Sequence, residues 1–481
     1  MRKGIAGYIR TFLLVSMLMH GEVATALDNS APSNTKQTQA AWQCKSSPLI
    51  VQNIKVWNGE QFLENQDIYV KGGKIAEIRN NKNSAYDRNI RTINGKGKIA
   101  LPGFIDSHAH FDAVAAAKEL QTELDVQTEI FPITMRQTIA SGVTFARTHL
   151  AALKDIKVME ELAADNCFPS PRLSLAGPGL LGGAPNVNGR LMRGFSSISD
   201  MEHKIREAAE LNTEWLAVHG IAKFSKEELI VLTQLTEQYG LKLLADADSF
   251  EALQTTVNSS AISGEYINRT AEPSFPDSIL AAIAKRNNPY YSVAPIGYYY
   301  RAQHYVDQPT PVIAASSLQF IDETVTARMK TSHSATYRDN RYIKQMVIAH
   351  PTLKQKFWEL RRAGAKQVIG TDSGSLGQFH IDAIWWELET WRNLGVPSNE
   401  IIDAATALPA QMLDQPDIGK LKEGYLADII LYDSTDFTGS LQKDLLSTVI
   451  KGGVIYVEKG EWVGPNRDQT IMAISKAKLM N

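Results

Sequence analysis

The chain has 481 residues, which is too long for one small domain and suits a large barrel with an accessory module. Lys and Arg number 50 against 52 for Asp and Glu, so the formal net charge is −2, and 44% of the residues are hydrophobic. This composition is ordinary for a soluble globular protein and gives neither a basic surface for nucleic acid nor a polybasic patch for a membrane.

The N-terminus has the pattern of a signal peptide. Arg2 and Lys3 supply positive charge, residues 12–19 form a short apolar run, and Ala24-Thr25-Ala26 fits a cleavage site. The run is too short to cross a bilayer. We expect residues 1–26 to be removed on export, which leaves a periplasmic or secreted protein without a membrane partner. The alternative is a disordered or weakly anchoring N-terminus.

A polar stretch and then a β pattern follow. Residues 27–48 are rich in Ser, Thr, Asn and Gln, which predicts a flexible lead-in. Alternating apolar strands separated by turns extend over 49–102 and predict the first part of a β-sandwich. The two cysteines, Cys44 and Cys167, could pair in an exported protein or remain as two buried thiols. Their spacing does not indicate a metal site.

Between residues 103 and 415 short apolar strands alternate with helical stretches, one of which we expect at 226–239. This rhythm predicts a parallel α/β fold, and we expect a (β/α)8 TIM-type barrel. The Tyr- and Thr-rich span 298–345 interrupts the rhythm and is interpreted as an inserted lid or loop.

Strand patterns return within 416–465, and residues 466–481 form a C-terminal tail. Neither β segment has enough strands to be stable alone, so we expect both ends of the chain to assemble one small sandwich.

The strongest chemical signal is the strand that ends in His108-Ala109-His110. Side chains two residues apart on a strand point to the same side, so both imidazoles can face one metal ion. A chance pair of surface histidines is the alternative, which the preceding Pro102-Gly103 and the strand ending make weaker.

A second strand, Val368-Ile369-Gly370-Thr371-Asp372, ends in a carboxylate among small residues. At the end of a barrel strand Asp372 can bind metal and accept a proton from metal-activated water. The alternative is that Asp372 caps the next helix.

Taken together, these motifs resemble the amidohydrolase superfamily, especially its imidazolonepropionase-like and Xaa-Pro/Arg carboxypeptidase-like branches. The resemblance extends over about 49–460, and the segments that carry it are 102–110, 141–147, 370–374, 386–389, 404–410 and 418–428. It implies a metal-dependent hydrolase in which metal-activated water attacks a C–N bond, with Asp372 as the eighth-strand ligand and proton shuttle.

The sequence departs from this family on strands four to six. The position of the bridging Lys or Glu on strand four is Ala217, the strand-five His is absent from 244–248, and Asn268 stands at the strand-six His position. A standard two-metal site is therefore not expected. We expect one divalent ion, zinc first with manganese or iron as alternatives, on His108, His110 and Asp372.

Several other residues are candidates for this site. An additional ligand could be His219, unless it is a satisfied loop histidine, or Asp246, unless an aspartate there caps the next helix. His149, His380, Asn268 and Arg147 are candidates for the substrate pocket.

These observations favour a hydrolase acting on carbon–nitrogen bonds other than peptide bonds, with a small amide, dipeptide-like or cyclic amide substrate. The alternative is a catalytically degenerate barrel, a pseudoenzyme, that binds a small molecule in the old pocket. We expect no nucleic-acid partner, and formation of a homo-oligomer stays open.

Overall fold

The computed structural model describes most of the chain. The described residues are 44, 46–81, 89–116, 123–266, 269–307, 313–330, 340–437 and 441–479. The expected signal peptide at 1–26 and nearly all of the expected lead-in at 27–48 lie outside them, as does Asn268. No helix within the described ranges is long and apolar enough to cross a membrane.

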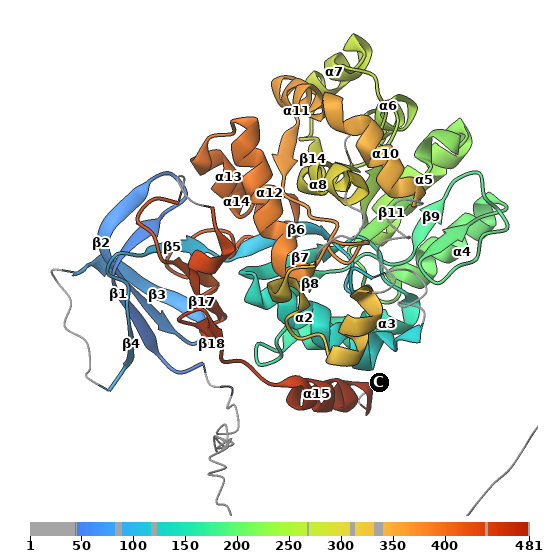
Figure 1. The fold of residues 1–481 in the computed structure, drawn as a ribbon. Helices are drawn as coiled ribbons and strands as arrows, with labels where there is room; N and C mark the ends of the chain where they lie inside the picture. Colours follow the sequence, from blue (N-terminus) through green and yellow to red (C-terminus); the bar gives the residue numbers. More distant parts are fainter. Residues whose placement is uncertain are drawn as a thin grey trace, which may run out of the picture. The chain divides into compact units, whose positions relative to one another are not determined.

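A nine-stranded sheet draws on both ends of the chain (Figure 1). Its strands are β1 (Leu49–Trp57), β2 (Phe62–Lys71), β3 (Lys74–Asn80), β4 (Arg91–Asn94), β5 (Ile99–Pro102), β16 (Ile429–Tyr432), β17 (Leu446–Lys451), β18 (Val454–Glu458) and β19 (Glu461–Trp462). The two chain ends meet where β5 pairs antiparallel with β16. Apolar residues from both halves, including Ile54, Val70 and Ile429, share one buried cluster.

The expected strands at 49–51 and 54–56 form the single strand β1 with an irregularity between them. Asn53 adopts a positive φ of 56° at this point, and its amide donates to the Asp67 carboxylate over 2.8 Å. Asn tolerates this left-handed conformation better than most residues, which allows the strand to continue.

Eight parallel strands follow the order of the chain around a ring, as the sequence predicts. They are β6 (Phe104–Ala109), β7 (Val143–Thr148), β8 (Arg172–Ser174), β11 (Trp215–His219), β12 (Lys242–Asp246), β13 (Ser263–Glu265), β14 (Tyr291–Val293) and β15 (Lys366–Val368). Isolated parallel bridges join the two arcs, Ala176 with Trp215 and Ala109 with Ser373. The predicted (β/α)8 fold is therefore confirmed. Two short strands, β9 (Gly179–Leu181) and β10 (Met192–Gly194), extend the sheet beside β11.

Helices cover the outside of the ring and connect its strands. Among the described residues they are η2 (Val126–Ile130), α2 (Phe131–Ala140), α3 (Leu153–Ala164), α4 (Ile198–Ala209), η3 (Ile221–Lys223), α5 (Lys226–Tyr239), α6 (Phe250–Asn258), α7 (Asp277–Ala284), α8 (Ile296–Asp307), η4 (Ala315–Leu318), α10 (Arg341–Ala349), η5 (His350–Thr352), α11 (Leu353–Arg362), α12 (His380–Leu394), α13 (Ser398–Ala404) and α14 (Ala407–Met412). In the C-terminal segment, η6 (Lys443–Leu445) lies between β16 and β17, and α15 (Arg467–Leu479) follows β19.

Helix α5 has the bounds that its pattern predicts, because both ends carry strong signals. Ser225 and Glu228 form a capping box at the start. Gly240 ends the helix in the left-handed conformation at a φ of 66°.

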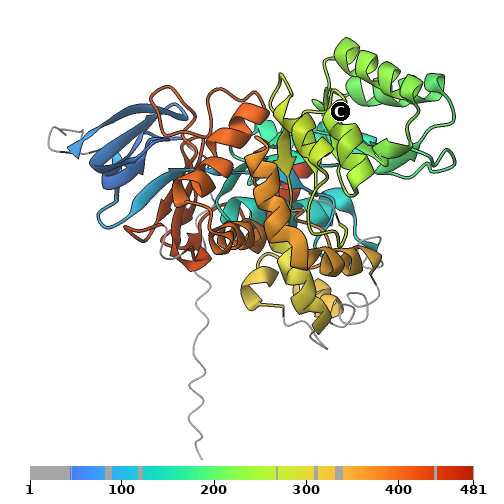
Figure 2. The same ribbon diagram turned by 90° about the horizontal axis from the view of Figure 1, so that it is seen from above.

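The span 298–345 is more regular than expected. Its described parts contain most of α8, η4, a helix at 323–330 and the start of α10. Helix α8 packs against both α10 and α12 (Figure 2). Tyr298 is buried there and donates to the Leu376 carbonyl over 2.6 Å. The tyrosines that made the segment appear irregular are thus part of a packed helical layer.

A disulfide joins Cys44, before β1, to Cys167, between α3 and β8. Of the two expectations for these cysteines, the structure has the paired one.

Candidate functional site

The site lies at the C-terminal ends of the barrel strands, where side chains from distant parts of the sequence converge. His108 and His110 stand at the end of β6, and Asp372 follows β15. Asp372 Oδ1 lies 3.1 Å from His110 Nε2 and 3.6 Å from His108 Nε2. The structure therefore brings together the three side chains that the sequence singles out as metal ligands, named below the first donor set.

Backbone geometry aims Asp372 at the imidazoles. The residue has a φ of 56°, and its amide donates to the His108 carbonyl over 2.9 Å. Two residues earlier, Gly370 packs closely on His108, since a Cβ built there would come within 2.8 Å of His108 Cβ. Helix α12 begins later, with Phe379 at its N-cap, so Asp372 does not cap that helix.

Two hydroxyl groups hold the carboxylate of Asp372. Ser375 Oγ donates to Oδ1 over 2.7 Å, and Tyr342 Oη donates to Oδ2 over 2.5 Å. A second tyrosine, Tyr266, places its hydroxyl 3.4 Å from His108 Nε2. The site is therefore lined on one side by phenolic hydroxyls that can donate or accept hydrogen bonds.

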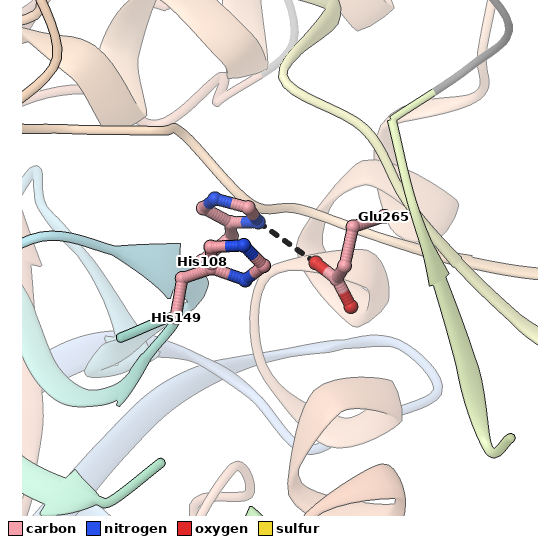
Figure 3. Close-up of side chains that lie close together, drawn as sticks. All are labelled: His108, His149 and Glu265. Atoms are coloured by element: carbon pink, nitrogen blue, oxygen red, sulfur yellow. Dashed lines mark hydrogen bonds and ion pairs between the residues drawn. The ribbon is translucent and has the colours of Figure 1, made fainter. Parts of the chain in front are cut away.

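Glu265, the last residue of β13, fixes the ring of His108. Its Oε2 lies 2.8 Å from His108 Nδ1, and Figure 3 shows the carboxylate at the edge of this ring. Its Oε1 accepts from Arg147 Nη2 over 2.7 Å and from Ser263 Oγ over 2.7 Å. Because Nδ1 is engaged in this way, His108 presents Nε2 to Asp372, an arrangement typical of metal-binding histidines.

The electrostatics of the first donor set favour a positive charge between its members. Burial opposes protonation of His108, but Asp372 and Glu265 outweigh it and raise its pKa to about 9. Burial opposes ionisation of Asp372, yet hydrogen bonds from His108 and His110 hold the pKa of its carboxyl well below the usual range. In the metal-free chain a proton on His108 supplies this positive charge, and a cation could replace the proton.

His149, His219 and Asp246 form a second donor set beside the first. Asp246 Oδ2 lies 2.7 Å from His219 Nδ1, and its Oδ1 lies 3.8 Å from His149 Nε2. The His149 ring stacks on the His108 ring with centroids 4.0 Å apart (Figure 3). Burial, reinforced by His108, lowers the pKa of His149 well below its usual value, so this ring is neutral at physiological pH.

Four buried polar atoms of the second donor set have no hydrogen-bond partner within the described part of the chain. They are both ring nitrogens of His149, His219 Nε2 and Asp246 Oδ1. A buried polar atom without a partner costs about 1–3 kcal/mol.

Each donor set fits a divalent cation, since one donor atom of each member lies within 4.8 Å of the others. Two imidazoles and one carboxylate are a ligand combination found at catalytic zinc sites. His108, His149 and Glu265 are also close, but Glu265 already uses both oxygens on Arg147 and His108.

The other expected residues have different surroundings. Arg147 contacts Glu265, Ser263 and the face of Trp215, so it acts on the site through Glu265 and does not face the proposed cation. His380 donates from Nε2 to the His110 carbonyl over 3.1 Å and thereby holds the backbone of a candidate ligand.

The structure also places the residues that stand where relatives carry their strand-four and strand-five ligands. Ala217 is buried in β11. Helix α6 is capped by Ser249, whose Oγ accepts from Ala252 N, so the idea that Asp246 or Asp248 caps it is wrong.

Glu265, Tyr266 and Tyr342 were not singled out from the sequence. Glu265 ends a short strand, which is the signal that also marks His108 and Asp372. Tyr342 lies in the span interpreted as a lid, and nothing in its local sequence places it against Asp372.

Comparison with known proteins agrees with the fold. The model of the amidohydrolase family matches residues 99–463, which confirms the resemblance seen in the sequence. A 5-methylthioadenosine/S-adenosylhomocysteine deaminase of Caldicellulosiruptor saccharolyticus is 21% identical over 435 residues, covering 83% of this chain and 91% of that protein.

Solved structures of the same fold are also similar. A prolidase complexed with N-methylphosphonate-L-proline has a TM-score of 0.68 and 16% identity, covering 86% of this chain and 100% of its own. A Xaa-Pro dipeptidase with bound methionine in the active site has a TM-score of 0.65 and 18% identity, covering 85% of this chain and 100% of its own.

Proposed function

Because the family model matches most of the chain, the protein belongs to the amidohydrolase family, and we propose that it is a metal-dependent hydrolase of C–N bonds in small substrates. The observation that carries this proposal is the meeting of His108, His110 and Asp372 at the mouth of the barrel.

These three residues would hold the catalytic cation, for which we propose zinc, with manganese or iron as alternatives. A divalent cation there would supply Lewis acidity, which activates water near neutral pH and polarises the carbonyl under attack. Asp372 is ionised and faces the imidazoles, so it is placed to accept a proton from the attacking water and return it to the leaving nitrogen. Tyr342 keeps this carboxylate in position.

We propose an amide, a dipeptide-like compound or a cyclic amide as the substrate. The names of similar proteins support this class, since a deaminase, a prolidase and a dipeptidase all act on bonds between carbon and nitrogen. We also propose that the protein is exported, which the disulfide between Cys44 and Cys167 supports because such bonds persist in oxidising compartments.

The test is hydrolysis of a substrate panel before and after metal removal. Xaa-Pro dipeptides, N-acyl amino acids, cyclic ureides and adenosine derivatives represent the class. Chelation should abolish cleavage and zinc should restore it, while His110→Ala and Asp372→Asn should each lose activity by about a thousandfold or more, since both remove a cation ligand. His203→Ala, on the exposed face of α4, is the matched control. Activity that survives chelation would refute the proposal.

A degenerate barrel that only binds a small molecule is the second candidate, and Ala217 at the strand-four position favours it. In that case His108→Ala would leave the metal content unchanged, because the wild type itself would bind no catalytic cation.

A further inference from the structure

The second donor set occupies strand ends like the first. His149 directly follows β7, His219 is the last residue of β11, and Asp246 is the last residue of β12. The three side chains therefore point into the same barrel mouth without sharing a residue with the first donor set.

Every member of this set has a ring nitrogen or carboxylate oxygen without a hydrogen-bond partner among the described residues. His219 Nδ1 and Asp246 Oδ2 lie 2.7 Å apart, so they could bind one ion side by side in place of the proton that they share, and His219 Nε2 and Asp246 Oδ1 have no hydrogen-bond partner there. His149 is 1% exposed, and neither of its ring nitrogens has a hydrogen-bond partner among the described residues. The 3.8 Å between His149 Nε2 and Asp246 Oδ1 is too long for a hydrogen bond and leaves room for an ion between them.

A cation accounts for this arrangement better than internal hydrogen bonding does. In that arrangement His149 Nε2, His219 Nδ1 and a carboxylate oxygen of Asp246 would surround one cation, which replaces the shared proton. Two imidazole nitrogens and one carboxylate oxygen suit zinc or a similar ion and leave a fourth position for water or substrate.

We propose that the protein binds a second divalent cation on His149, His219 and Asp246, next to the ion of the proposed catalytic site. The stacked rings of His108 and His149 would make the two ions neighbours. The inference deepens the proposed function, because two adjacent cations could bind the two ends of a polar substrate group. No ligand is shared, so each ion can be removed separately.

Zinc stoichiometry tests this proposal without measuring activity. Metal-free full-length protein is dialysed against zinc chloride, and the bound zinc per chain is measured by mass spectrometry. We expect two ions in the wild type, one in His219→Ala, one in Asp246→Asn and one in His110→Ala. The double variant of His110→Ala with His219→Ala should bind none, and His203→Ala should bind two.

The outcomes separate this proposal from the proposed function. A wild type that binds one ion, lost in His110→Ala but kept in His219→Ala, overturns the second site and leaves the catalytic site intact. One ion lost in both variants also overturns it, since a single cation would then use both sets.

Two further results complete the test. One ion lost in His219→Ala but kept in His110→Ala supports these ligands and overturns the proposed catalytic ion. Two ions retained in both His219→Ala and Asp246→Asn overturn the second site. The wild-type count stays decisive if a variant does not fold, which circular dichroism melting would show.

Discussion

A chain of contacts that starts at Arg147 fixes the orientation of the His108 ring in the first donor set. The guanidinium of Arg147 holds Glu265, Glu265 holds Nδ1 of His108, and Nε2 of His108 faces Asp372. All these side chains are buried, so the ring of His108 has little freedom to turn. The geometry of the site therefore depends on residues that do not face the cation position.

Glu265→Gln tests this dependence. An amide in place of the carboxylate weakens the grip on His108, so we expect zinc affinity to fall about 10–100-fold, as measured by competition with a chelating dye. The unpaired Arg147 should also destabilise the fold by about 3–5 kcal/mol. In the double variant with Arg147→Met the stability should partly recover while the affinity stays low. Wild-type affinity in Glu265→Gln would show that Glu265 does not position His108.

Tyr342→Phe removes one hydrogen bond to Asp372 and little else. A hydrogen bond to a charged group contributes about 1.5–3 kcal/mol, so kcat/KM should fall roughly 10–100-fold. The comparison is Tyr239→Phe, the last residue of α5, which packs against the separate apolar cluster that α5 shares with α4. A change of less than about twofold would mean that Asp372 is held by Ser375 and the backbone alone.

The sequence predicts the ligands of the first donor set because they stand at strand ends, which the barrel fold brings to one mouth. It does not predict Tyr342, whose contact with Asp372 depends on how α10 packs. For His219 the sequence leaves a ligand and a satisfied loop histidine open, and the structure places its ring against Asp246. Contacts between distant elements leave no periodic signal in a single sequence.

At the scale of elements, the contact of α8 with α12 contains a buried acid. Glu387 on α12 is fully buried, and its Oε1 accepts from Gly297 N, in α8, over 2.6 Å. Burial raises the pKa of this carboxyl well above its usual 4.5. Helices α8 and α12 are therefore joined by the carboxyl group of Glu387. This group stays protonated at pH values at which an exposed glutamate is ionised.

Because of Glu387, the free energy of unfolding should decrease as pH rises above 4.5. Above pH 4.5 the unfolded chain releases the proton of Glu387 while the folded chain keeps it, so the stabilising contribution is complete below pH 4.5 and is lost as pH rises. The free energy of unfolding of the wild type, relative to Glu387→Gln, should decrease between pH 4.5 and 7 in urea titrations. Glu389→Gln, on the exposed face of α12, is the matched control. An increase over this range would contradict the account.

The elements that the sequence predicts best carry their own end signals. Helix α5 has a capping box and a terminal glycine, and its bounds agree with the prediction. In the span 298–345, Asp322 and Asn340 accept hydrogen bonds from the first turns of the helix at 323–330 and of α10. Its helices also depend on packing of tyrosines such as Tyr298 against neighbouring elements, which a single sequence does not reveal.

At the scale of the whole molecule, the disulfide closes a large loop across the fold. Cys44 and Cys167 are separated by 123 residues, and a bond of this kind typically stabilises a protein by about 2–4 kcal/mol. The Cys44→Ser/Cys167→Ser variant should unfold at a lower temperature than the wild type, and reductant should produce the same shift in the wild type. Two free thiols per chain in non-reduced, unfolded protein would contradict the pairing.

We propose that the barrel holds a cation where β6 and β15 close the ring, between His108, His110 and Asp372. Diffraction from zinc-loaded crystals, recorded at the zinc absorption edge, tests that claim directly. If these residues bind zinc, we expect an anomalous peak at about 2.0–2.2 Å from the facing atoms of His108, His110 and Asp372. A map with no peak among these three side chains would contradict it.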